Sequence, residues 1–492
     1  MTYRLPTNCI SNGATIGMRT VLGMLVLAIG FAGTVGRTEA ADRYELGKRL
    51  QRCEREWQLA TPEARARAVA PMQSAVGSFF SLQFGRAARG LDEAWFAVRS
   101  TDSPSNEERL AIAHRILLAP RLVDAANTTL KIAGSPCYDV AETLDSQGEF
   151  ELRRGNGTTV ARQAFRWLDL PQGIDLNLDG IGPGDFKLVL TGSVGSLPME
   201  LNWVMVSRVD RLADRMAAVE RAKSSWPGDA SETVRATVDG LLGLLKSLAS
   251  EQVQETDFPA NRLLEHCETL VASQGRSVST LRELASGQDA WITLARDGSQ
   301  SPIRLRAPPP AEPNPQSDEK PWPVLFLFHG AGGSENMFFD AYGAGRAVDL
   351  GTERRWLVIA TRQTLFNNID CKEILDILHD YFPIDRKRVF CIGHSMGAGQ
   401  VVRQVTRHPQ LMSAAAALGG GGRVGQPESV RHVRWFVGAG EADFGRGGAV
   451  NLVRSLEKSG ANATYREYKQ VEHMMIVQAA LDDVFRFFDD ES

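Results

Sequence analysis

The sequence has little of what marks a metal-binding or nucleic-acid-binding protein. Its six cysteines form no CxxC pair, and no group of histidines, cysteines and carboxylates has the spacing of metal ligands. The net charge of -4 gives no basic surface for a polyanion. We therefore expect no metal, no other cofactor and no nucleic-acid partner. The sequence also has no internal repeat, which argues against a solenoid.

Long hydrophobic runs are also scarce, and the run near the start is short. Val21 to Ala32 follows Arg4 and Arg19 and precedes Thr38-Glu-Ala40. This order of basic, apolar and small residues is typical of a secretory signal peptide, which we place at residues 1–40. The run is shorter than the roughly 20 residues of a membrane span. We expect export, to the periplasm or out of the cell, without a stable membrane span; an uncleaved N-terminal anchor is the alternative.

Removal of the signal would also remove one of the six cysteines. The odd number that remains leaves at least one free thiol, and the spacing of these cysteines assigns no disulfide. Cys391 lies within an apolar run, so we expect it to be a small buried hydrophobic residue.

The length of 492 residues, with 43% hydrophobic and 23% charged residues, indicates an ordinary globular protein of more than one domain. Apolar residues recur at helical spacing from Leu46 to Trp57, from Val234 to Leu248 and from Leu263 to Val271, and a further helix is expected from Glu107 to Leu118. Between about residues 149 and 208 apolar and polar residues alternate instead, which predicts a small β element. Residues 41–286 are thus expected to form a mainly helical region with a β element.

Within this β element, Asp175-Leu-Asn-Leu-Asp-Gly180 matches the start of a calcium-binding loop. In such loops alternate oxygen-bearing side chains, here beginning with Asp175 and reaching Asp179, face one ion. The match fails at the twelfth position, where Phe186 replaces a bidentate carboxylate and Asp185 comes one residue early. We expect an Asx-rich turn, and a calcium site is the alternative.

From about Gly287 the pattern changes to alternating strands and helices. A hairpin is expected at residues 290–307, and the apolar run Val324 to Phe328 reads as a buried parallel strand. The proline-rich segment 308–321 is an interdomain linker or a surface loop. We favour the loop, because the hairpin before it can form the edge of the next sheet. Residues 287–492 are expected to form an α/β domain whose mostly parallel sheet has helices on both faces.

This segment is organised around Gly393-His-Ser-Met-Gly397, which lies between an expected strand and an expected helix. A GxSxG box in that setting forms a nucleophile elbow. The serine occupies a strained turn, so the residues two before it and two after it must be small. Upstream, an expected strand runs into His329-Gly-Ala-Gly-Gly-Ser334, whose small residues let a backbone N–H approach a developing oxyanion.

Residues 287–492 resemble the α/β-hydrolase family. The glycine-rich turn, the serine box, a late acidic loop and a final histidine look most like secreted esterases grouped with polyhydroxybutyrate depolymerases and feruloyl esterases. The resemblance implies an α/β-hydrolase fold. It also implies that Ser395 is the nucleophile, Asp443 the orienting acid and His473 the general base, in the chain order that this fold uses.

The same resemblance implies an oxyanion hole built from backbone groups. The N–H of Met396 would supply one hydrogen bond, and the N–H of Ala331 or Gly332 the other. The resemblance says nothing about residues 41–286.

Some of these roles have competitors nearby. Glu441 lies in the same loop as Asp443, but the strand should end near Gly438 and the acid of this family falls a few residues later. His432 is less suitable than His473, because it lies at the opposite end of a strand. Two further histidines near the serine box are expected to be structural: His329 and His394.

These features predict an exported serine hydrolase that cleaves carboxylic esters through an acyl-enzyme. Only Gly419 to Arg431 separate two late strands, so no cap domain fits there. The site is either open, which suits a polymeric or cell-wall-derived ester, or covered by residues 41–286. A serine peptidase or thioesterase on the same fold is one alternative, and an inactive hydrolase-fold binding protein is another. The exact substrate and the oligomeric state stay open.

Overall fold

The computed structural model describes most of the chain after the expected signal peptide. The described residues are 42–140, 146–194, 197–250, 252, 255–275, 278–310, 320–363 and 370–490. The expected signal peptide lies outside them, as does most of the proline-rich segment 308–321. Within this part of the chain, no helix has both the length and the apolar character needed to cross a membrane.

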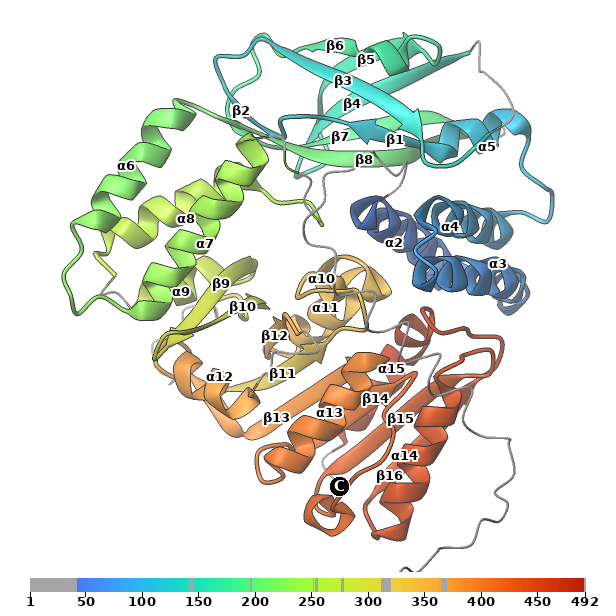
Figure 1. Cartoon of the computed structure of the whole chain (residues 1–492), viewed down its shortest axis with the longest axis vertical. Helices are drawn as coiled ribbons and strands as arrows, with labels where there is room; N and C mark the ends of the chain where they lie inside the picture. Colours follow the sequence, from blue (N-terminus) through green and yellow to red (C-terminus); the bar gives the residue numbers. More distant parts are fainter. Residues whose placement is uncertain are drawn as a thin grey trace, which may run out of the picture.

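A sheet of eight strands forms the centre of the C-terminal half (Figure 1). Its strands are β9 (Asp289–Arg296), β10 (Ser299–Arg306), β11 (Trp322–Phe328), β12 (Leu357–Thr361), β13 (Ile384–His394), β14 (Ala414–Leu418), β15 (Arg434–Gly440) and β16 (Ala463–Tyr468). They follow the order β16-β15-β14-β13-β11-β12-β10-β9, in which β10 is antiparallel to β9 and β12 and the other neighbours are parallel. The predicted edge hairpin and mostly parallel sheet are confirmed, and with the serine turn after β13 this is the α/β-hydrolase fold.

Helices cover both faces of this sheet. They are α11 (Arg346–Glu353), α12 (Cys371–Leu378), α13 (Met396–Arg407), α14 (Arg446–Lys458) and α15 (Ile476–Asp489), with the short α10 (Met337–Asp340), η2 (Tyr342–Gly345) and η3 (Pro427–Val430). Alternate residues of β11 belong to different cores: Phe326 lies in the core on one face, and Leu325 and Leu327 in the core on the other. A strand buried on both sides has to be apolar throughout, which explains the continuous run.

Three helices near the start of the described chain share one of these cores. They are α2 (Arg43–Leu59), α3 (Pro62–Phe80) and α4 (Phe84–Arg99). The predicted apolar stripe of α2, from Leu46 to Trp57, is buried in the cluster that also holds Leu327 of β11. Figure 1 shows these helices close to α10 of the C-terminal half. The N-terminal helices therefore pack directly onto the C-terminal half.

The β element is larger than expected and starts earlier. Its strands are β1 (His114–Leu117), β2 (Leu122–Asp124), β3 (Thr129–Pro136), β4 (Gln147–Arg154), β5 (Thr159–Arg166), β6 (Ile174–Asn177), β7 (Gly184–Val194) and β8 (Leu197–Val209), with η1 (Leu170–Gln172). They form two sheets, β1-β3-β6 and β2-β8-β7-β4-β5. The helix predicted from Glu107 to Leu118 is wrong in its second half, because α5 (Asn106–Ala113) ends where β1 begins. Pairing of β1 with β3 buries Ile116 and outweighs the local helical pattern.

The loop that resembles a calcium site uses its side chains within the protein. Asn177 accepts the backbone N–H of Asp179 at 2.8 Å, which is the expected Asx turn. Asp185 accepts the N–H groups of Asn261 and Arg262, and Phe186 is buried in the core. In the described residues, no group of three or more histidine, cysteine or carboxylate side chains is arranged to hold a metal ion.

Four helices follow the β element: α6 (Leu212–Ser224), α7 (Glu232–Ala249), α8 (Ala260–Ala272) and α9 (Val278–Ala285). The predicted stripes of α7 and α8 are confirmed as core. One face of α7 lies along β9, the edge strand of the large sheet. The hydroxyl of Thr233 accepts the N–H of Ala295 at 3.1 Å, and that of Thr237 accepts the N–H of Thr293 at 3.1 Å. These side chains cover backbone groups that a bare edge strand would expose.

The cysteines of the described chain are free. All five, Cys53, Cys137, Cys267, Cys371 and Cys391, are buried and unbridged. Cys391 has no exposed surface in the middle of β13, as expected, and burial raises the pKa of its thiol.

Candidate active site

Ser395 occupies a sharp turn between β13 and α13. Its backbone has φ 55° and ψ −114°, a strained conformation for a residue other than glycine. A Cβ on Gly393 would lie 2.1 Å from the carbonyl oxygen of Gly397, and a Cβ on Gly397 would lie 2.0 Å from that of Phe328. The two glycines of the box are therefore required by close backbone packing, as predicted for a nucleophile elbow.

The structure brings Ser395, His473 and Asp443 together from three separate loops. Ser395 follows β13, Asp443 follows β15, and His473 lies between β16 and α15. The Nε2 atom of His473 lies 2.9 Å from the Oγ atom of Ser395, and its Nδ1 atom lies 2.6 Å from the Oδ1 atom of Asp443. Asp443 and His473 are buried, whereas Ser395 is half-buried. The three side chains form one hydrogen-bonded line.

The competing residues lie outside this line. Glu441 is exposed and accepts the backbone N–H of Gln470 at 3.2 Å. His432 is exposed, and its Nε2 atom bonds to the carbonyl oxygen of Pro409 at 2.6 Å. Neither touches the serine.

The carboxylate of Asp443 is held in its ionised form. Burial alone would raise its pKa, but the hydrogen bond and charge of His473 and the N–H of Gly445, 2.6 Å from Oδ1, together lower it. An ionised carboxylate next to Nδ1 keeps the imidazole proton there. The Nε2 lone pair of His473 then faces the hydroxyl of Ser395, which is the arrangement that a general base needs.

The predicted oxyanion residues border the serine. A Cβ on Gly330 would lie 3.3 Å from the Cβ of Ser395, so the glycine-rich turn runs directly beside this serine. Ala331 and Gly332 line the same cavity as Ser395, and Gly332 has a positive φ of 81°. Met396 is the first residue of α13, and N–H groups in the first turn of a helix have no acceptor within it. Ala331 and Gly332 thus line the same cavity as Ser395, and Met396 directly follows the serine in the chain.

Tyr342 connects the glycine-rich turn to the histidine loop, and no pattern in the sequence indicated this role. Its hydroxyl accepts the N–H of Gly330 at 3.1 Å and bonds to the Nδ1 atom of His394 at 2.9 Å. The Nε2 atom of His394 bonds in turn to the carbonyl oxygen of His473 at 2.8 Å. Burial and the neighbouring His473 lower the pKa of His394 to about 3, so it stays neutral. As predicted, His394 is structural, and it tethers the loop that carries His473.

His329 is structural as well. Its Nδ1 atom lies 2.7 Å from the carbonyl oxygen of Gly330, and its Nε2 atom accepts the N–H of Gln363 at 3.2 Å. Burial lowers the pKa of this histidine to about 4. The side chain closes the end of β11, as expected.

Glu472, next to the proposed base, is a second feature that the sequence did not indicate. Its Oε1 atom accepts the N–H groups of Met474 and Met475, both at 2.8 Å, and the carboxyl is buried. Burial raises its pKa to about 7 despite these hydrogen bonds. The carboxyl fixes the turn that leads from His473 into α15.

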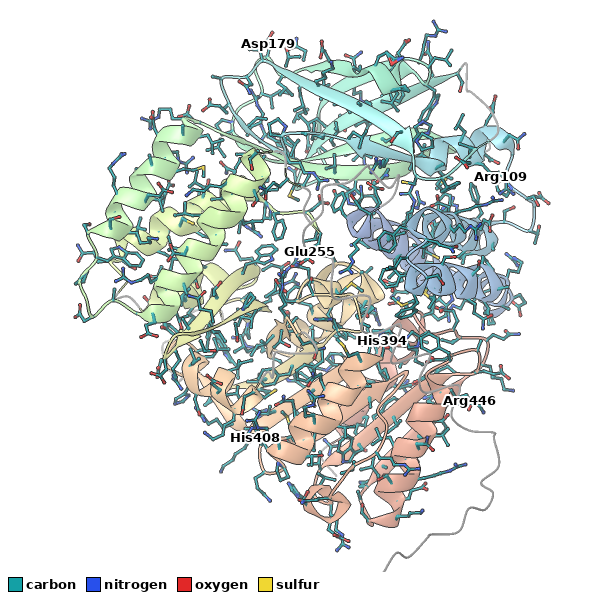
Figure 2. The ribbon with its side chains drawn as sticks, viewed as in Figure 1. Arg109, Asp179, Glu255, His394, His408 and Arg446 are labelled. Atoms are coloured by element: carbon teal, nitrogen blue, oxygen red, sulfur yellow. The ribbon has the colours of Figure 1, made fainter. Side chains whose placement is uncertain are left out.

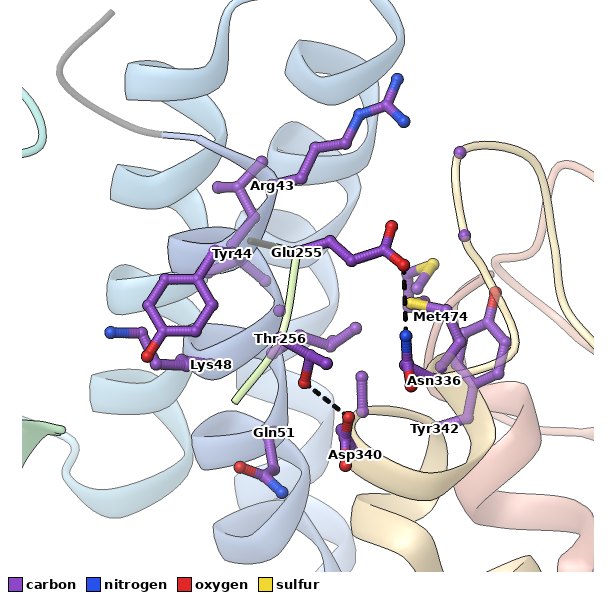
Figure 3. A pocket seen from close by; sticks show the side chains of 18 of the residues that line it. Arg43, Tyr44, Lys48, Gln51, Glu255, Thr256, Asn336, Asp340, Tyr342 and Met474 are labelled. Carbon is purple, nitrogen blue, oxygen red and sulfur yellow. Dashed lines mark hydrogen bonds between the residues drawn. The ribbon is translucent and has the colours of Figure 1, made fainter. Parts of the chain in front are cut away.

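Ser395 opens into a cavity of about 380 Å³ whose far wall belongs to the N-terminal region. Helices α2, α3 and α4 and strand β8 contribute to this wall, and Figure 3 labels Tyr44 and Gln51 of α2 among the lining residues. Glu255 and His394 are two of the residues that line this cavity, and Figure 2 labels both of them. Of the two arrangements left open by the sequence, the structure shows a site covered by residues 41–286.

No family model matches the chain, and no curated protein matches it. Among solved structures, a thermostable esterase is 23% identical, with coverage of 41% of this chain and 62% of that one and a TM-score of 0.35. The serine hydrolase FphF of Staphylococcus aureus, which binds fluorophosphonates, is 14% identical over 42% of this chain and 100% of that one, with a TM-score of 0.35. A ferulic acid esterase is 17% identical over 41% of this chain and 97% of that one, also with a TM-score of 0.35. The fold assignment rests on the strand order and the elbow rather than on these scores.

Proposed function

We propose that the protein is an exported serine hydrolase that cleaves carboxylic esters through an acyl-enzyme. One observation carries this proposal: the imidazole of His473 bonds to Ser395 on one side and to Asp443 on the other. A serine hydroxyl is a poor nucleophile until a neutral imidazole can take its proton, and a carboxylate keeps that imidazole in the required tautomer. The basic and apolar pattern of residues 1–40 supports the export.

In the proposed reaction, Ser395 attacks the ester carbonyl while His473 accepts its proton. The negative charge on the tetrahedral intermediate falls beside the glycine-rich turn, where the N–H groups of Met396 and of Ala331 or Gly332 would bind it. His473 then protonates the leaving alcohol. Water, activated by the same imidazole, attacks the acyl-enzyme and regenerates the serine.

A fluorophosphonate probe tests this proposal directly. The probe should label the wild-type protein and leave Ser395→Ala unlabelled. Hydrolysis of short p-nitrophenyl esters should fall by about 10⁶-fold in the same variant. A wild-type protein that resists labelling would favour an inactive binding protein.

The bond that is cleaved needs a separate measurement, because peptidases and thioesterases use the same three groups. We expect wild-type protein to hydrolyse p-nitrophenyl esters much faster than peptide anilides or acyl thioesters of matched acyl length. Faster hydrolysis of the anilide or the thioester would still show a serine hydrolase, but it would make the protein a peptidase or a thioesterase rather than an esterase.

A further inference from the structure

The wall of the cavity opposite Ser395 comes from a part of the chain outside the hydrolase fold. We propose that helices α2 and α3 form the substrate pocket of this site, and that the substrate is a small ester with an apolar group. This inference rests on the proposed function, since it concerns the same serine. It excludes the polymeric substrate that an open site would suit.

Helix α3 reaches the site itself. A Cβ on Gly332 would lie 2.8 Å from the ring of Phe79, so this phenylalanine lies against the oxyanion turn. Phe80, the last residue of α3, has its ring centre 6.0 Å from that of Phe444, whose ring centre lies 3.8 Å from that of His473. The C-terminal end of α3 thus contacts both sides of the site, and a substrate at Ser395 has to lie beneath it.

A second segment closes the cavity between α2 and α10. Asn336 donates a hydrogen bond to Glu255 at 3.1 Å, and Thr256 donates one to Asp340 at 2.6 Å (Figure 3). Asp257 accepts the hydroxyl of Tyr44 at 2.6 Å. Residues 255–257 therefore bridge the N-terminal helices and the catalytic half at one side of the cavity.

The cavity has the size and lining of a small-molecule site. Its volume of about 380 Å³ is near the lower end of the roughly 300–1,000 Å³ usual for such sites. Its lining from α2, α3 and α4 includes apolar side chains, among them Leu50, Met72, Val76, Phe80 and Leu91. A polymer strand needs an open groove, whereas an apolar group of limited length fits a space of this kind.

Three of the charged groups that line the cavity have ion-pair partners within the protein. Lys48 pairs with Glu45 at 2.7 Å, and Asp340 pairs with Arg304 at 2.7 Å. Lys187 pairs with Glu200. These three groups are therefore not free to bind a substrate.

Gly47 offers a way to test the pocket. Arg43, Gly47, Gln51 and Arg55 lie on one face of α2 at intervals of four residues, and all line the cavity. A Cβ on Gly47 would meet no atom within 4 Å. A side chain at this position should therefore enter the cavity without disturbing the helix, and Gly47→Phe should shorten the space available to the substrate.

The experiment compares wild-type protein with Gly47→Phe and with the control Gly243→Phe. Gly243 lies on an exposed face of α7, away from the cavity, and a Cβ there also meets nothing within 4 Å. Two ester series are used: p-nitrophenyl esters with acyl chains from acetate to dodecanoate, and acetates of alcohols from ethanol to dodecanol. In at least one series, Gly47→Phe should lower the ratio of kcat/KM for octyl-length to shortest substrates by about 10-fold. Gly243→Phe should keep the wild-type ratio.

Fluorophosphonate labelling separates failure of this inference from failure of the proposed function. Suppose that the wild-type protein is labelled at Ser395, but that Gly47→Phe leaves the kcat/KM ratio of long to short substrates unchanged in both ester series. The assignment of the pocket is then overturned, and the proposal of a serine hydrolase remains. If wild-type protein is not labelled, the proposed function itself fails. Faster wild-type turnover of a polyester film than of the soluble esters would also overturn the inference. Thermal unfolding checks that Gly47→Phe is folded, and Gly47→Leu replaces it if it is not.

Discussion

The hydroxyl of Tyr342 connects the glycine-rich turn to the loop that carries His473. The proposed reaction needs these two loops at a fixed distance from each other. The hydroxyl accepts the N–H of Gly330 and bonds to His394, which bonds to the backbone of His473. Because His394 stays neutral, its Nε2 proton is donated to the carbonyl of His473 and its Nδ1 accepts the tyrosine proton. The oxyanion turn and the base are therefore positioned by one chain of hydrogen bonds.

Tyr342→Phe should slow catalysis without removing any reacting group. The phenylalanine keeps the ring packed against Phe338 but leaves the N–H of Gly330 and the Nδ1 of His394 unpaired. We expect kcat to fall by about 10-fold and the free energy of unfolding to fall by about 1–3 kcal/mol, with KM changed little. Steady-state kinetics and denaturant unfolding measure these effects.

The matched control is Tyr468→Phe. This substitution removes a hydroxyl at the end of β16 that donates a hydrogen bond of 2.7 Å to Asp483 of α15. It should leave kcat near the wild-type value. A positioning role for Tyr342 is wrong if both variants lower kcat equally.

The sequence predicted the three side chains that the structure brings together, Ser395, Asp443 and His473, but not the groups that position them. Ser395 could be found because an elbow needs two small residues at fixed spacing from the serine, and Asp443 and His473 because they follow late strands in a fixed order. Tyr342 and Glu472 have no such spacing, because their partners include backbone groups whose position depends on the folded loops. Long-range packing of this kind leaves no local pattern.

At the scale of elements, the elbow depends on how closely α13 approaches β11. Gly397→Ala should disrupt it, because the added Cβ would lie 2.0 Å from the carbonyl oxygen of Phe328, a rigid backbone atom. Overpacking of this kind costs about 1–3 kcal/mol or more, so the thermal midpoint should fall and ester hydrolysis should be lost.

Gly399→Ala is the control on the same helix, since its Cβ would meet nothing within 4 Å. Replacing a glycine within a helix by alanine should stabilise the protein by about 0.5–1 kcal/mol. Equal destabilisation by the two substitutions would contradict the close approach at Gly397.

Helices and strands with a strong hydrophobic periodicity could be predicted from the sequence. Strands that depend on pairing with a distant strand could not. The stripes of α2 and α7 and the apolar run of β11 each reflect burial on one face or on both, so the pattern reports the element. The strand from His114 to Leu117 could not be predicted in this way. Four residues are too few to show a hydrophobic period, and its partner strand, β3, lies later in the chain. Its neighbours in α5 gave it a helical appearance.

In the whole molecule, the first half of the chain replaces the cap that the hydrolase half lacks. Helices α2 to α4 share a core with the sheet, and α7 covers its edge strand through Thr233 and Thr237. The short connection between β14 and β15 predicted that no cap is inserted there. It could not show that residues 41–286 fold back over Ser395, since that depends on the match between two distant surfaces.

The shared cores predict that residues 287–492 are not stable alone. Without the first half, the inner residues of β9 and the sheet face beneath α2 lose their cover, and the edge groups of β9 lose their threonine partners. Each fully buried large apolar side chain contributes about 1.5–3 kcal/mol, so exposing several of them exceeds a net stability of about 5–15 kcal/mol. We expect the fragment to aggregate, or to unfold without a cooperative transition by circular dichroism, and co-expression with residues 42–286 to restore a soluble complex that a fluorophosphonate labels. A soluble fragment that unfolds cooperatively on its own would show that the catalytic half is an independent domain and that its cover is dispensable for folding.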